Sequence, residues 1–164
     1  RCDRVLHRVQ QRNAGFEKRR AEAAGRGKIR GIGLSNDMRG NLLAPESRGQ
    51  VRAMEMAYRS AGWEPSDVEY IECHGTGTRA GDTTEVESLV QLWKGTTTNA
   101  GVCAIGSVKS MIGHLLTAAG AAGMIKTLLA IKHRTLPPSI NFDQAPVNSP
   151  LTDSPFRVDR KSVV

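Results

Sequence analysis

Short apolar runs alternate along this chain with longer segments whose apolar residues recur at helical spacing, and this alternation constrains the fold most. The predicted strands are 29–34, 68–72, 103–108 and 156–158, and the predicted helices are 49–61, 82–93 and 115–131. Strands that alternate with helices favour an α/β layered structure with a largely parallel sheet. The proline-rich stretch before the last strand is expected to run extended over the surface.

Residues at the expected helix ends support these assignments. Ser47 can cap the helix 49–61, and Gly62 stands where a left-handed C-cap is expected. Asp82 is predicted to cap the second helix, with Glu85 three residues later as in a capping box. Polar loops are expected at 35–45 and at the Thr- and Asn-rich turn 95–101.

The positive charge of the chain is confined to one end. The 164 residues carry a net charge of +7, and residues 1–30, with ten basic and three acidic side chains, account for all of it. We interpret residues 1–28 as a basic N-terminal segment, a loop or linker of a parent domain, and favour a solvated loop over a binding arm. A nucleic-acid partner is not expected, because the segment has no aromatic interleaving and no recognisable binding motif.

Cysteine usage and hydropathy bear on the compartment. Cys2, Cys73 and Cys103 are irregularly spaced and form neither a zinc-ligand pattern nor a disulfide framework, so a reduced, cytoplasmic setting fits best. The longest apolar stretch, 115–125, has 11 residues, whereas a membrane span needs roughly 20. It predicts a buried helix and no membrane partner. The chain begins with Arg rather than Met, which suggests a piece of a longer protein.

Two histidines follow predicted strands. His74 comes directly after the strand 68–72, and His114 comes shortly after the strand 103–108. Ligands of α/β sheets bind beyond the carboxyl ends of the strands, so both imidazoles could converge on one site. From these positions alone, two structural histidines held by hydrogen bonds are as well supported as two catalytic ones. His7 and His133 have no comparable setting and are interpreted as surface residues.

Small and hydroxyl-bearing residues surround His74. The loop Gly75–Gly81 permits a tight turn and close approach of a substrate, and the hydroxyls of Thr76 and Thr78 could hydrogen-bond amides of an extended ligand. The loop is no dinucleotide fingerprint, because Ala80 stands where the third glycine is needed. Cys73 is expected to pack on the sheet, since neighbours in a strand point to opposite faces.

Three segments together resemble the β-ketoacyl synthase family. The segment 72–85 looks like its first histidine motif, 106–114 resembles its lysine and second histidine motif, and 136–142 resembles the tail that follows. The order and spacing of all three agree with the family. The resemblance covers about residues 29–158, predicted to be a ketosynthase C-terminal half-domain, and leaves 159–164 as a tail.

The resemblance implies a fold, a reaction and residue roles. The family has the thiolase fold, an α/β sandwich of two similar halves, and this chain looks like the second half. Ketosynthases catalyse a decarboxylative Claisen condensation of a cysteine-bound acyl thioester with malonyl-carrier protein, an acyltransferase reaction of polyketide and fatty-acid biosynthesis. The implied roles are hydrogen-bond donation to the malonyl unit by His74 and His114, support of His114 by Lys109, contact with the phosphopantetheine arm by Thr76 and Thr78, and structural support by Asp82, Glu85 and Gly113.

The resemblance also implies partners and an incomplete site. The family's nucleophilic cysteine lies in the first half, so the chain alone is expected to be inactive and to need an N-terminal half and an acyl carrier protein as partners. The completed domain is expected to be a homodimer, and this chain is expected to bind no cofactor or metal itself. Gly123 stands nine residues after His114, where dissociated fatty-acid enzymes have glutamate, which favours a multidomain synthase. Met111 replaces the asparagine usual in polyketide enzymes and points the other way. The alternative is a non-catalytic ketosynthase remnant that acts as a dimerisation or interaction module.

Overall fold

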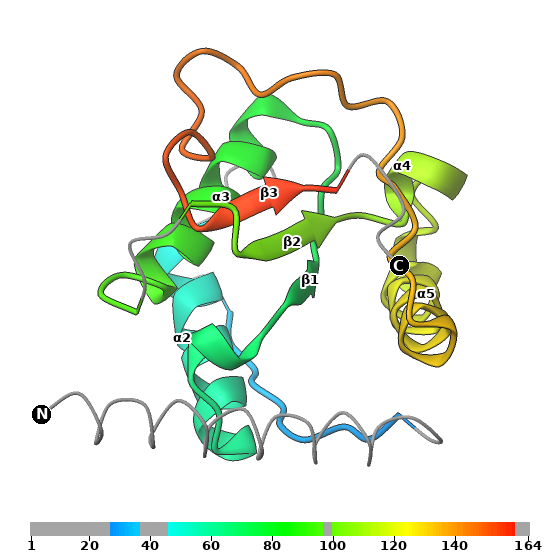
Figure 1. Cartoon of the computed structure of the whole chain (residues 1–164). Coiled ribbons are helices and arrows are strands. Elements are labelled where there is room, and N and C mark those ends of the chain that lie inside the picture. Colours follow the sequence, from blue (N-terminus) through cyan, green and yellow to red (C-terminus); the bar gives the residue numbers. More distant parts are fainter. Residues whose placement is uncertain (1–26, 37–45, 97–99, 160–164) are drawn as a thin grey trace, which may run out of the picture.

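The computed structural model describes residues 27–36, 46–96 and 100–159 (Figure 1). Residues 1–26, most of the loop 35–45, the centre of the turn 95–101 and residues 160–164 lie outside this description, and so do the predictions made for them. In chain order the elements are α2 (Ser47–Ala61), a 3-10 turn (Pro65–Asp67), β1 (Tyr70–Glu72), α3 (Arg79–Leu92), β2 (Cys103–Gly106), α4 (Lys109–Ile112), a second 3-10 turn (Leu116–Ala118), α5 (Ala119–His133) and β3 (Phe156–Val158).

The three strands form one parallel sheet in the order β1-β2-β3, which confirms the expected pairing mode. Ile71 pairs with Ile105 across the first ladder, and Ile105 pairs with Val158 across the second. Because the pairs are parallel, the carboxyl ends of all three strands meet at one edge of the sheet. Both motif histidines come shortly after one of these strands in the sequence, which places them near that edge.

Helices cover both faces of the sheet, with α2 and α3 on one side and α4 and α5 on the other (Figure 1). Successive strand residues point to opposite faces. On the α3 side the buried core consists of Leu89, Trp93, Cys103, Ile105 and Phe156. On the α5 side, β1 presents the polar side chains of Tyr70 and Glu72, which contact Lys126 of α5. The sheet therefore has one apolar face and one face that carries a buried polar cluster.

The predicted strand 29–34 is wrong. Residues 27–36 form no strand, and Gly31 and Gly33 instead lie against the backbone of α2. A Cβ atom at Gly31 would lie only 2.1 Å from the carbonyl oxygen of Ala57, so the glycine lets the segment pack directly on the helix backbone. Arg52 of α2 donates to the Ser35 hydroxyl at 3.0 Å. An apolar run becomes a strand only where a neighbour completes its ladder, and here a helix takes that place.

Two helix N-termini differ from the prediction. Helix α2 begins at Ser47 with Glu46 as its N-cap, and the Ser47 hydroxyl accepts a hydrogen bond from Ser88 of α3 at 3.0 Å instead of capping. Helix α3 begins three residues before Asp82, with Thr78 as its N-cap. Asp82 therefore lies inside the first turn. At the other end of α2, Gly62 does adopt the predicted left-handed conformation, with φ of 66°.

The segment between β2 and α5 contains a short helix and a 3-10 turn that the sequence did not predict. Strand β2 ends at Gly106 rather than at residue 108, and the short helix α4, which was not predicted, follows it. Helix α5 begins at Ala119 and not at Leu115, because a 3-10 turn precedes it. These breaks place Gly113 and His114 in a bend between two helices.

Residues 134–155 contain no helix and, apart from an isolated bridge at Leu136, no strand, but turns between 147 and 153 interrupt the expected extended course. They lead to β3 where it was predicted. The amide of Ser139 donates to the carbonyl of Asp159 at 2.6 Å, and the side-chain amide of Asn141 donates to the Ser110 carbonyl at 3.3 Å. The second of these bonds holds the stretch against α4. Within the described residues, no helix is both long and apolar enough to cross a membrane.

Candidate functional site

His74 and His114 lie next to each other, although 40 positions separate them in the sequence. Their ring centroids are 5.5 Å apart, and the rings meet edge to face at 84°. His74 lies two residues beyond β1, and His114 follows the C-cap of α4. Both side chains are exposed, so the pair is open to a ligand. The expected convergence of the two histidines is confirmed.

The loop that carries His74 is tied to α3 by one carboxylate. Glu85 accepts the backbone N–H of His74 at 2.6 Å and that of Gly75 at 2.8 Å, one with each oxygen. A second tie comes from Ser107, whose hydroxyl donates to the His74 carbonyl at 3.3 Å. Gly75 has φ of 42°, and a Cβ there would come within 2.7 Å of the Ser107 Cβ. Only glycine lets the two motif loops approach this closely.

The backbone around His114 sets the orientation of its ring. Gly113 has φ of 75°, which turns the chain out of α4. The backbone N–H of Leu116 donates to His114 Nδ1 at 2.9 Å. Because Nδ1 accepts this bond, the proton of the neutral ring resides on Nε2. His114 thus presents an N–H donor on the side away from its own backbone.

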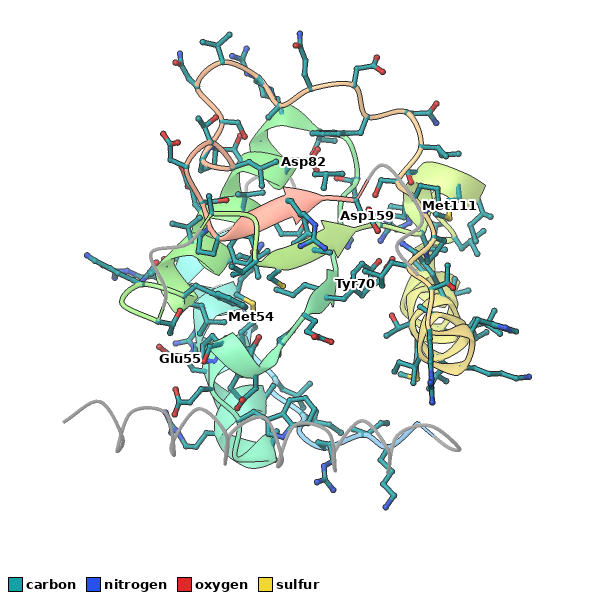
Figure 2. All side chains as sticks on the ribbon, in the orientation of Figure 1. Met54, Glu55, Tyr70, Asp82, Met111 and Asp159 are labelled. Atoms are coloured by element: carbon teal, nitrogen blue, oxygen red, sulfur yellow. The ribbon has the colours of Figure 1, made fainter. Side chains whose placement is uncertain are left out.

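The other predicted site residues lie in the loop that carries His74 or in the first turns of α3 and α4. Lys109 is the first residue of α4, and its ammonium makes no hydrogen bond or ion pair with any part of the chain that the structure describes. The hydroxyls of Thr76 and Thr78 lie 3.2 Å apart, at the start of α3. Asp82, labelled in Figure 2, accepts the Gly77 N–H at 3.2 Å and so closes the same loop.

Neither described cysteine resembles a nucleophile. Cys73 packs against the core cluster, as expected, and burial raises the pKa of its thiol well above the usual range. Burial also raises the pKa of Cys103 to about 12. A cysteine nucleophile needs a lowered pKa and an accessible thiolate. These two thiols stay protonated at neutral pH.

We predict slow alkylation of both thiols as a consequence. At pH 8, iodoacetamide is expected to modify Cys73 and Cys103 on the order of 100-fold more slowly than free cysteine, because the raised pKa lowers the thiolate fraction and burial limits access. Peptide-resolved mass spectrometry after timed labelling measures each rate, and labelling in denaturant is the control. Labelling of Cys73 as fast as free cysteine would contradict the burial.

A buried polar cluster formed by Tyr70, Glu72 and Lys126 was not predicted. Lys126 is the one charged residue within the otherwise apolar run 115–131. That isolated charge was the available signal, since a lysine whose charge becomes buried requires a partner. In this protein Glu72 is that partner, at 2.9 Å.

An apolar groove of about 560 Å³ lies between α4, α5 and the start of the extended stretch. Its walls include Met111 (labelled in Figure 2), Ile125 and Leu129. The prediction that the apolar stretch 115–125 is buried is wrong in this chain: large apolar side chains stay exposed along α5 and just before it, with Leu116 at 77% and Ile125 at 57%. Among the described residues, no three His, Cys, Asp or Glu side chains gather in a way that could hold a metal ion.

Residues 26–143 match the family described as "Beta-ketoacyl synthase, C-terminal domain". The chain belongs to this family. Among curated proteins it is similar to the polyketide synthase PksN of Bacillus subtilis, with 40% identity over 143 residues, which are 83% of this chain and 3% of that protein. It is also similar to the polyketide synthase PksL of the same organism, with 40% identity over 134 residues, covering 81% of the chain and 3% of the relative.

Solved ketosynthase structures share the fold. Ketosynthase twelve of the bacillaene polyketide synthase from Bacillus amyloliquefaciens superposes with a TM-score of 0.76 at 43% identity, over 81% of this chain and 24% of that one. An oxazolomycin ketosynthase domain from Streptomyces albus JA3453 gives a TM-score of 0.77 at 35% identity, over 87% and 26%. The predicted thiolase-like α/β fold is confirmed. The β-ketoacyl synthase chain spans about a quarter of each of these two ketosynthases.

Proposed function

We propose that this chain is the C-terminal half of a polyketide-type ketosynthase and that it contributes His74 and His114 as hydrogen-bond donors to a decarboxylative Claisen condensation. Membership of the family and the similarity to polyketide synthases support the reaction class. The observation that carries the role of the histidines is their geometry: two exposed rings 5.5 Å apart at the carboxyl edge of the sheet.

The reaction requires donors at one particular oxygen. The bond between the malonyl carboxylate and its methylene carbon breaks, carbon dioxide leaves, and the electron pair passes into an enolate whose charge rests on the thioester oxygen. The enolate carbon then forms a bond to the acyl carbonyl, and the thiolate of the enzyme cysteine leaves and is reprotonated. Preorganised N–H groups that face the enolate oxygen lower the barrier to the first step.

The hydrogen bond from Leu116 suits His114 to this task. Because Nδ1 accepts that bond at 2.9 Å, the single N–H of the neutral imidazole is on Nε2. A neutral donor can stabilise the developing oxyanion without a competing proton transfer. His74, held by the Glu85 bonds to its own amide and that of Gly75, supplies the second donor from the adjacent loop.

The remaining motif residues have supporting roles in this proposal. Lys109 supports the electrostatics of His114 from the start of α4. Thr76 and Thr78 bind the phosphopantetheine arm of the malonyl-carrier protein. The loop bonds of Asp82 and Glu85, and the bend at Gly113, keep the donors in place.

The chain needs partners because its described cysteines have raised pKa values and are no acyl acceptors. The acyl-bearing cysteine comes from an N-terminal ketosynthase half, and the substrate arrives on an acyl carrier protein. The exposed apolar residues of α5 and the adjoining groove form the surface that the N-terminal half covers. Homodimerisation is proposed for the completed domain.

A reconstitution experiment tests this proposal. The chain alone is expected to show no stable acylation and no decarboxylation of malonyl-carrier protein, followed by mass spectrometry and carbon dioxide release. When combined with an N-terminal ketosynthase half that carries the active-site cysteine, it is expected to form a complex and to release carbon dioxide. Stoichiometric acylation of one cysteine in the isolated chain would overturn the claim of inactivity. A complex that forms but releases no carbon dioxide would favour the non-catalytic interaction module.

A further inference from the structure

A buried ion pair links the sheet to α5. Lys126 Nζ lies 2.9 Å from Glu72 Oε2, and the two side chains are 6% and 15% exposed. Charges this deeply placed require close partners and further hydrogen bonds, since desolvation is otherwise costly. The further hydrogen bonds of Glu72 and Lys126 therefore show which parts of the chain the ion pair joins.

Tyr70 completes the ion pair as a triangle. Its hydroxyl donates to Glu72 Oε2 at 2.5 Å and accepts from Lys126 Nζ at 2.8 Å. Burial, followed by the hydrogen bond to Glu72, raises the pKa of Tyr70 far above its usual value, so the hydroxyl remains a donor. Figure 2 shows Tyr70 on β1, on the side of the strand that faces α5. Lys126 and Tyr70 together hold one carboxylate oxygen.

The other carboxylate oxygen reaches the second histidine motif. Glu72 Oε1 accepts the backbone N–H of Val108, the residue that caps α4. The segment from Val108 to His114 begins at this bond. Gly123 of α5 leaves room for the carboxylate, because a Cβ there would lie 3.0 Å from the Glu72 Cγ.

We propose that Glu72 is a positioning residue for His114. It fixes the start of the segment 108–114 through the Val108 amide, while Tyr70 and Lys126 hold its carboxylate in the required orientation. The strand that leads to His74 thereby sets the placement of the other histidine. The functional part of this inference rests on the proposed role of His114, but the geometry can be tested without any activity.

A purely stabilising ion pair would behave differently on removal. Loss of stability accelerates hydrogen exchange throughout the cooperative core, whereas loss of positioning loosens one segment while the rest stays protected. The amides of Val108 and Leu116 report on the segment, because the first donates to Glu72 and the second to His114 Nδ1. The amide of Cys103, bonded to the Pro155 carbonyl at 3.0 Å, reports on the sheet.

The test is NMR-detected hydrogen exchange on the full 164-residue chain and its variants Glu72→Gln, Tyr70→Phe and Glu69→Gln. Glu69→Gln is the matched control, because Glu69 precedes the same strand and is exposed. In Glu72→Gln we expect exchange of the Val108 amide to rise about 10- to 100-fold, since a hydrogen bond to a charged group is lost. The Leu116 amide should also exchange faster, the His114 ring ¹⁵N shifts should change, and Cys103 should stay protected.

Tyr70→Phe should move the same probes in the same direction by a smaller factor, and Glu69→Gln should move none. Unchanged Val108 and His114 probes in Glu72→Gln, or equal acceleration at Val108 and Cys103, would overturn the proposal. If Glu72→Gln does not fold, Tyr70→Phe decides by the same criteria. These outcomes are distinct from the reconstitution result, because a loosened segment can be measured whether or not carbon dioxide is released.

Discussion

His114→Ala is expected to lower malonyl decarboxylation by the reconstituted ketosynthase about 10²- to 10³-fold, the usual effect of removing one preorganised oxyanion donor. The His114 ring presents Nε2–H because its Nδ1 accepts the Leu116 amide at 2.9 Å. Alanine leaves the enolate oxygen without this partner. The measurement is the initial rate of carbon dioxide release from malonyl-carrier protein, at saturating concentration of the N-terminal half.

His114→Gln and His114→Asn are the matched controls for donor position. A glutamine amide can place an N–H near the position of Nε2, whereas the shorter asparagine places one near Nδ1. We therefore expect Gln to retain more activity than Asn, and Asn to resemble Ala. Binding of the N-terminal half should be unchanged in all three. An Ala variant within about threefold of the unmodified rate would contradict a donor role for His114.

Trp93→Ala is expected to reduce the free energy of unfolding by about 3–5 kcal/mol, the range for loss of a large buried aromatic side chain. Trp93 is 2% exposed and lies edge to face with Phe156, with ring centroids 5.1 Å apart. It joins the end of α3 to β3, which are more than 60 residues apart in the chain. Urea unfolding followed by far-ultraviolet circular dichroism measures the loss.

Trp63→Ala is the control for this second result. Trp63 is only half-buried, just after α2, so its truncation should cost about 1 kcal/mol. Trp93→Phe should fall between the two alanine variants, because it keeps an aromatic contact with Phe156. Equal losses for Trp93→Ala and Trp63→Ala would show that the core is not centred where the structure places it.

Features that depend on short-range sequence were predictable. Strand β1, strand β3 and the left-handed Gly62 follow from local apolar patterns and turn chemistry; β3 and Gly62 were found where expected, and β1 begins two residues later than predicted. The meeting of His74 and His114 followed from a topological rule, because both residues come after parallel strands. The motif resemblance was equally local, and it led to the family whose C-terminal domain residues 26–143 match.

Features that depend on neighbours in space were not predictable. The run 29–34 has the composition of a strand, but whether it is one depends on a ladder partner, and here it lies on α2. Asp82 has the sequence context of a cap, yet α3 starts at Arg79 and the carboxylate instead accepts the Gly77 amide. In both cases several local structures are compatible with the residues, and tertiary contacts select one.

The sequence by itself determined the α/β class, the family and the pair of histidines, because periodicity and motif spacing are written along the chain. Only the tertiary structure decided that Nδ1 of His114 accepts a hydrogen bond, that the pKa values of the described thiols are raised, and that Glu72 joins β1 to the second histidine motif. The physical reason is that donor direction, desolvation and ion pairing depend on distances between residues tens of positions apart. Such distances exist only once the helices have packed on the sheet.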